Sequence, residues 1–367
     1  MRIARVLYAL LLVLALSAVA AFGATPVTLD PSTGCGPLTN TQDSGGGCIE
    51  PTVTAYGGWV AWSHLDPATD NFQLALRDPQ GTELAAPVAE RKTPFDVSLG
   101  PSAHGVVAVY SRCTDEVNLL GCAIVELQLA GIATTTPLAS GSTGASGASG
   151  TGEPAGVTAP EIALTVPLSG SLHAPAIWNN RLVFLRRDRI YSWTIGAHKA
   201  TELPFPSSDG NPGLIGGLSL NGTEVAYTTS PSGAVVIQGL WVQTLGRAPR
   251  FIEGITVGQG AECASMFLSP IIVGSYLYAF HQDCDQFQPK RWERYSLKST
   301  ATYRADVNFQ DGADNEIHSV VPDRGGVTWI SPVTGAVLHL ANFPWKSVTR
   351  KEVHAIEREG CTLRNGC

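Results

Sequence analysis

The chain has 367 residues, of which 44% are hydrophobic and 15% are charged, with 39 glycines and 24 prolines. Its formal net charge of −7 makes it mildly acidic, and an acidic surface repels phosphate backbones and anionic lipids, so nucleic acid is disfavoured as a partner. Helix signals are nearly absent after the first 20 residues, because no long stretch has 3.6-residue periodicity. We therefore expect a protein built from short strands.

Residues 1–20 have the pattern of a secretory signal peptide. Arg2 and Arg5 precede an apolar run, and Ala18, Val19 and Ala20 supply small residues at a cleavage site. An uncleaved membrane anchor is the alternative, but the run is short for a span of roughly 20 residues. Loss of the two leader arginines lowers the net charge from −7 to −9. The sequence predicts a secreted, periplasmic or extracellular protein with no membrane insertion after cleavage.

Eight cysteines in an exported chain predict disulfides. Two pairs flank proposed hairpins, where antiparallel partners come close enough to bond. The other two pairs close short loops in an N-terminal segment, 21–50, and in a C-terminal tail, 351–367. A zinc site is the alternative, but no cysteine or histidine pair has ligand spacing. The predicted disulfides are Cys113–Cys122, Cys263–Cys284, Cys35–Cys48 and Cys361–Cys367.

Six times along the chain, a small turn cluster leads into a short apolar strand that ends on or near an aromatic residue. A repeat of roughly 40 to 50 residues built from short strands is typical of a propeller. Each repeat also has a second strand and, in most cases, a later turn and a weaker strand. The pattern predicts an all-β fold, a six-bladed β-propeller of four-stranded antiparallel blades over residues 51–350. The aromatic landmarks are Trp62, Tyr110, Phe184, Tyr227, Tyr278 and Trp329.

The interval between the second and third landmarks is too long for one blade. The excess is residues 141–156, which are almost wholly Gly, Ser, Thr and Ala. This composition cannot bury a core. We expect a flexible insertion between blades two and three; a true domain boundary is the alternative.

Two segments, 219–227 and 321–329, resemble the Ser-Pro-Asp-Gly-x-x-Ile-Ala-Tyr unit of WD40-like propellers of the TolB type. The resemblance implies that the loops between second and third strands share one face with the loops joining blades. These loops are 63–71, 113–122, 141–156, 207–213, 281–290 and 308–316. Nothing resembles the separate amino-terminal α/β domain of TolB, so the Tol role is not transferred. Loops held on a rigid scaffold are where binding usually occurs.

Two groups of residues are candidate ligand sites. His173 and His318 each precede their blade's aromatic landmark and are expected near the mouth of the central channel, where they could titrate or hold a metal; polar lining is the simpler interpretation. Oxygen ligands suited to calcium occur in two acidic loops, without the spacing of the twelve-residue calcium loop. These are Asp283 and Asp285, and Asp311, Asp314 and Glu316. Acidic solvated turns are the alternative, and no other cofactor is expected.

The sequence predicts no catalytic residue. It contains neither a Gly-x-Ser-x-Gly elbow nor a His-Glu-x-x-His motif. The favoured hypothesis is a secreted, non-catalytic propeller that binds a protein partner on its loop face. The alternatives are a carbohydrate-binding or carbohydrate-active propeller, a lectin or lyase with aromatic stacking on sugars, and a calcium-stabilised structural domain.

Overall fold

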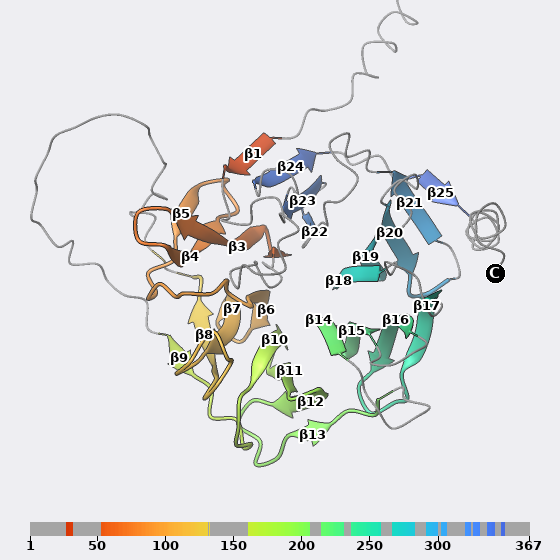
Figure 1. Cartoon of the computed structure of the whole chain (residues 1–367), viewed down its shortest axis with the longest axis horizontal. Helices are drawn as coiled ribbons and strands as arrows, with labels where there is room; N and C mark the ends of the chain where they lie inside the picture. Colours follow the sequence, from red (N-terminus) through yellow and green to blue (C-terminus); the bar gives the residue numbers. More distant parts are fainter. Residues whose placement is uncertain are drawn as a thin grey trace, which may run out of the picture.

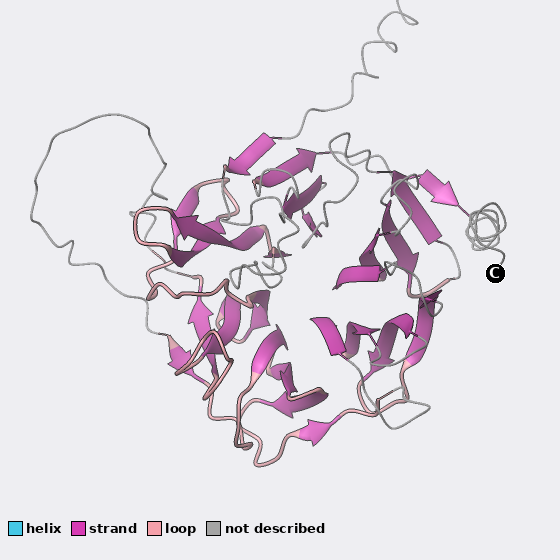
Figure 2. Ribbon diagram, in the orientation of Figure 1, coloured by secondary structure: helices cyan, strands magenta, loops and turns pink. Residues whose placement is uncertain are grey.

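A computed structural model describes residues 27–31, 53–130, 132, 161–205, 214–230, 236–257, 266–282, 291–299, 302–306, 320–323, 326–330, 336–341 and 346–348. These residues form strands and turns, and Figure 2 shows no helix among them. The strands make six antiparallel sheets arranged in a ring (Figure 1). The fold is therefore the predicted six-bladed β-propeller.

In blades 1 to 4, neighbouring strands pair in chain order from the central axis outwards, and blades 5 and 6 each add an outer strand from a distant part of the chain. Blade 1 contains β2 (Thr54–Tyr56), β3 (Trp59–Asp66), β4 (Asn71–Arg77) and β5 (Glu83–Ala85). Blade 2 contains β6 (Ser98–Ser102), β7 (Gly105–Arg112), β8 (Ala123–Gln128) and β9 (Ile162–Ala163). Blade 3 contains β10 (His173–Trp178), β11 (Arg181–Arg186), β12 (Arg189–Thr194) and β13 (Thr201–Glu202).

Blade 4 contains β14 (Leu214–Asn221), β15 (Glu224–Ser230), β16 (Val236–Thr244) and β17 (Arg250–Val257). Blade 5 contains β18 (Met266–Val273), β19 (Tyr276–Gln282), β20 (Arg291–Ser296) and β21 (Thr302–Asp306), and β25 (Lys346–Val348) pairs with β21 as a fifth strand. Blade 6 contains β22 (Val320–Asp323), β23 (Gly326–Ile330) and β24 (Val337–Ala341).

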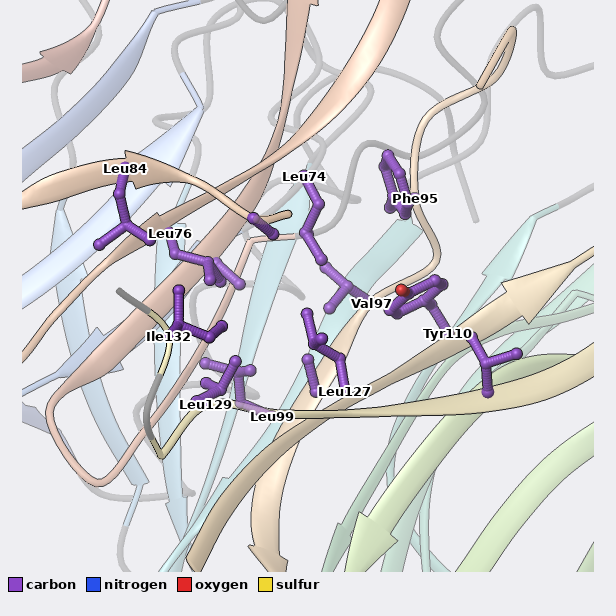
Figure 3. Close-up of a cluster of buried hydrophobic side chains, with 14 of the residues drawn as sticks. Leu74, Leu76, Leu84, Phe95, Val97, Leu99, Tyr110, Leu127, Leu129 and Ile132 are labelled. Carbon is purple, nitrogen blue, oxygen red and sulfur yellow. The ribbon is translucent and has the colours of Figure 1, made fainter. Parts of the chain in front are cut away.

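The six aromatic landmarks all lie on the second strand of their blade, and each is at most 8% exposed. A second strand has a blade neighbour on each of its faces, so both sets of its alternating side chains are buried. In β7, Ala108 and Tyr110 pack between blades 1 and 2, whereas Val107 and Val109 pack towards blade 3. Figure 3 shows the first of these clusters, in which Phe95 and Val97 lie beside Tyr110.

The innermost strands approach one another so closely that some positions have no room for a side chain. A Cβ added to Gly100 of β6 would lie 2.1 Å from the carbonyl oxygen of Ile177 in β10. Glycine at this position therefore lets the backbones of blades 2 and 3 come into direct contact.

The N-terminal strand β1 (Val27–Asp30) completes blade 6 by pairing with β24. Leu29 of β1 joins the apolar cluster that contains Trp62 of blade 1. The buried Asp30 carboxylate accepts hydrogen bonds at Oδ2 from Trp62 Nε1 at 2.7 Å and lies 2.8 Å from His64 Nδ1. A strand that precedes the predicted propeller range, residues 51–350, thus closes the ring and connects blade 6 to blade 1.

The expected place of residues 141–156, between blades two and three, is corrected by the pairing of β9. Ile162 and Ala163 pair with Glu126 and Val125 of β8, so they are the fourth strand of blade 2. The connection that contains 141–156 therefore lies within blade 2. It starts at the end of β8 opposite the β7–β8 loop, so it is attached at the face opposite the predicted loop face. The sequence could not reveal β9, because its two residues are both exposed and have no apolar alternation. Residues 141–156 themselves lie outside the described residues.

Candidate functional site

The loop between β7 and β8 is closed at its base by the disulfide Cys113–Cys122, one of the four predicted. Each cysteine is next to a residue of the last strand pair, Arg112 with Ala123, so the disulfide takes the place of the next pair in the hairpin. Above it, Asp115 and Leu120 exchange two backbone hydrogen bonds, of 2.9 and 3.2 Å. The Asp115 carboxylate accepts hydrogen bonds from the backbone and side-chain nitrogens of Asn118. The loop is therefore a constrained hairpin tip.

The tip is attached to the segment that joins blade 1 to blade 2. The Glu116 carboxylate accepts a hydrogen bond of 2.8 Å from the backbone nitrogen of Lys92, and it lies 3.7 Å from Nε of Arg91. The Lys92 ammonium group donates to the carbonyl oxygen of Asp70 in the β3–β4 loop. Three separate loops thus share one set of polar contacts.

Arg91 is the buried centre of these contacts, with 4% of its surface exposed. Its guanidinium donates to the carbonyl oxygen of Ser111 and to Thr93 Oγ1, and lies 3.6 Å from the Asp96 carboxylate. It also stacks over the ring of Phe95, 5.1 Å from the centroid. Burial lowers the pKa of Arg91, and the carboxylates of Asp96 and Glu116 oppose this shift. A buried cation with two carboxylate neighbours fixes the joining segment against blade 2.

The β3–β4 loop lies beside this segment. Glu90 accepts hydrogen bonds from Thr69, Asn71 and Gln73, at 3.2, 3.0 and 2.8 Å. We define the blade 1–2 loop surface as residues 66–73, 89–96 and 112–122. It lies at the end of the blades that carries the turns between second and third strands, which is the predicted loop face. Nothing in the sequence singled out the charged residues of 89–96, because isolated charges in a connecting segment form no motif.

His173, a predicted channel-mouth residue, begins the innermost strand of blade 3, opposite Leu185. Burial lowers the pKa of its imidazole, while the charges of Asp96 and Asp188 oppose the shift. Asp96 also accepts a hydrogen bond from the backbone nitrogen of Ala174, the next residue. His173 is thus linked electrostatically to the blade 1–2 loop surface. Among the described residues, no group of three or more His, Cys, Asp or Glu side chains is arranged to hold a metal ion.

The remaining candidate residues lie outside the described residues, so their predicted roles stay predictions. They are His318, Asp283, Asp285, Asp311, Asp314 and Glu316, together with Cys35, Cys48, Cys263, Cys284, Cys361 and Cys367. Within the described ranges, no helix has both the length and the apolar character needed to cross a membrane.

Aromatic residues in the described segments serve mainly in blade packing. Trp62, Trp193 and Trp329 are at most 5% exposed. Among the partly exposed aromatics, Tyr56 of blade 1 and Trp178 of blade 3 meet edge to face at the opposite face, with ring centroids 5.4 Å apart. Both are half-buried, so each keeps part of its surface in solvent.

No protein-family model matches the chain, and no curated protein matches it. Solved structures with a similar fold include a putative TolB from Agrobacterium tumefaciens, at 15% identity and a TM-score of 0.41 over 80% of this chain and 90% of that one. The β-propeller domain of the Trilobed protease from Pyrococcus furiosus has 10% identity and a TM-score of 0.40 over 82% and 83%. A mutant Aleuria aurantia lectin in complex with alpha-methyl-L-fucoside has 10% identity and a TM-score of 0.44 over 81% and 93%. With TM-scores below 0.5, these similarities carry no argument about function, and the β-propeller fold of this chain rests on its own six sheets.

Proposed function

We propose that this protein is a non-catalytic propeller that binds another protein through the blade 1–2 loop surface. The observation that carries the proposal is the set of contacts that cross-links the loops of this surface. One disulfide and the buried Arg91 hold loops from two blades in one arrangement. Binding usually occurs on loops fixed by a rigid scaffold, and a preorganised surface loses less conformational entropy when a partner binds.

We also propose that the protein acts outside the cytoplasm. The Cys113–Cys122 disulfide supports this, because disulfides persist in oxidising compartments and are rare in the cytosol. The signal-peptide pattern of residues 1–20 points to the same export route. Cell fractionation with an antibody against the protein, together with N-terminal sequencing of the exported form, tests both statements; a cytosolic protein retaining Met1 contradicts them.

Site-specific photo-crosslinking tests the binding face. A photoreactive amino acid replaces Ala68 or Lys92, which are exposed on the blade 1–2 loop surface, and His104 or Thr223, which are exposed on hairpin turns of the opposite face. Each variant is illuminated in the exported fraction of its own cells, and adducts are identified by mass spectrometry. We expect one protein to crosslink from Ala68 and Lys92 but not from the control positions. Equal adducts from both faces, or none from the loop surface, contradict the proposal.

Carbohydrate binding is the second candidate, and it is favoured by the half-exposed Tyr56–Trp178 pair. Tyrosine and tryptophan combine an apolar ring with a polar O–H or N–H group. The ring can pack against the apolar face of a sugar, and the polar group can bond to its hydroxyls. The test is a glycan array with wild type and Trp178→Ala. A glycan retained by wild type and lost by the variant supports this function over protein binding, provided that the variant keeps the wild-type melting temperature.

A further inference from the structure

Three exposed apolar side chains are concentrated on the tip of the disulfide-closed loop. Val117 is 69% exposed, Leu119 40% and Leu120 56%. In the described part of the chain, only four other large apolar residues are exposed, and these are scattered over β1, β9, β17 and β18. Single exposed apolar residues are ordinary, but a contiguous group marks an interaction site. We call Val117, Leu119 and Leu120 the apolar tip.

The apolar tip is held in its exposed position by the backbone beneath it. Leu119 has a φ of 51°, a left-handed conformation that is uncommon for a branched side chain. The carbonyl oxygen of Leu120 accepts hydrogen bonds from the backbone nitrogen and the hydroxyl group of Thr114. A Cβ at Gly121 would lie 2.4 Å from Thr114 Oγ1. The loop therefore cannot easily turn its apolar side chains inwards, and strained backbone of this kind is common at binding sites.

The charge beside the apolar tip distinguishes between two classes of partner. Asp115 is partly exposed beside the apolar tip, and its hydrogen bonds from Asn118 lower its pKa, so it is anionic at neutral pH. The chain as a whole carries a formal net charge of −7. A membrane-binding tip normally combines apolar residues with lysine or arginine, because cellular membranes have anionic surfaces. An apolar tip beside a carboxylate on an acidic protein instead complements an apolar pocket with a basic rim.

We propose that the apolar tip is the anchor of the interface, inserting into an apolar pocket of a partner protein whose rim carries lysine or arginine. This inference rests on the proposed function and names the partner's chemistry. Side chains that are fully desolvated in a pocket near the centre of an interface carry most of the binding energy, while the contacts around them exclude water. Asp115 contributes mainly to the rate of association and to its salt dependence.

The test uses the protein that crosslinks to Ala68 or Lys92, purified, with binding measured by biolayer interferometry. Val117→Ser combined with Leu120→Ser removes most of the apolar tip, and Val273→Ser removes an exposed apolar side chain from the opposite face as the matched control. We expect the double variant to raise Kd about 30-fold, corresponding to about 2 kcal/mol, and the control to leave it unchanged. We also expect Asp115→Asn to reduce the salt dependence of the association rate. Near-ultraviolet circular dichroism and melting confirm that each variant is folded.

Three outcomes overturn the proposal, and they differ in what they say about the proposed function. An unchanged Kd in the double variant, with crosslinks from Ala68 and Lys92 intact, refutes the apolar tip as anchor and leaves the proposed function standing. The absence of any partner at the loop surface refutes both. Flotation of wild type, but not of the double variant, with phosphatidylcholine vesicles identifies a lipid surface as the occupant and refutes a protein pocket.

Discussion

Replacement of Asp30 by alanine should destabilise the ring at its point of closure. Asp30 is 2% exposed and lies on β1, the only strand that joins the N-terminal segment to blade 6 among the described residues. The substitution removes the acceptor of the Trp62 Nε1 hydrogen bond and the partner of His64 Nδ1. The indole nitrogen is only a donor, so its proton would remain buried without an acceptor. A hydrogen bond to a charged group contributes about 1.5 to 3 kcal/mol, so loss of the carboxylate from both contacts should cost about 3 to 6 kcal/mol.

This loss is large compared with the roughly 5 to 15 kcal/mol that stabilises a typical protein. Urea unfolding, followed by tryptophan fluorescence, gives the free energy of unfolding for wild type, Asp30→Ala and Asp30→Asn. The asparagine variant keeps one oxygen acceptor, and we expect it to lose about 1.5 to 3 kcal/mol, as for a single hydrogen bond to a charged group. Asp66→Ala, in an exposed turn, is the control. If Asp30→Ala lowers the free energy of unfolding by less than about 1 kcal/mol, as a surface substitution would, the contacts of this carboxylate do not stabilise ring closure.

Three further predictions concern blades 2 and 3. Gly100→Ala places a Cβ against the carbonyl oxygen of Ile177, and we expect a loss of about 1 to 3 kcal/mol by urea unfolding; a loss below about 0.5 kcal/mol, as for a surface substitution, would contradict the direct backbone contact. Burial raises the pKa of Glu126 above its ordinary value of 4.5, so its ionisation destabilises the folded protein as the pH rises through the folded pKa. Glu126→Gln should therefore raise the melting temperature at pH 7, with no gain below about pH 4, and a gain that persists in acid contradicts this explanation. Deletion of 141–156 should leave the circular dichroism spectrum and the melting curve almost unchanged, because loop length has a small effect on stability; gross unfolding of the deletion variant would count against a loop.

Most of the fold could be predicted from the sequence, because the second strand of every blade is buried on both faces. Burial on both faces produces the apolar runs that end at Trp62, Tyr110 and Tyr227, and the regular spacing of these runs predicts the number of blades. The Cys113–Cys122 disulfide was also predictable, since its cysteines flank a recognisable hairpin. These features are local: each depends on residues that are close together in the chain.

The closure of the ring and the arrangement of the blade 1–2 loop surface were decided only by the tertiary structure. Asp30 meets Trp62 across 32 residues, and Arg91 meets Ser111 and Glu116 from different loops. Such contacts leave no periodic pattern, because their partners are brought together by the ring and not by a strand or turn. The sequence by itself determined the repeated blade, whose pattern is imposed by burial. The tertiary structure decided which end strand closes the ring and which loops share a surface, because both depend on how blades pack around a common axis.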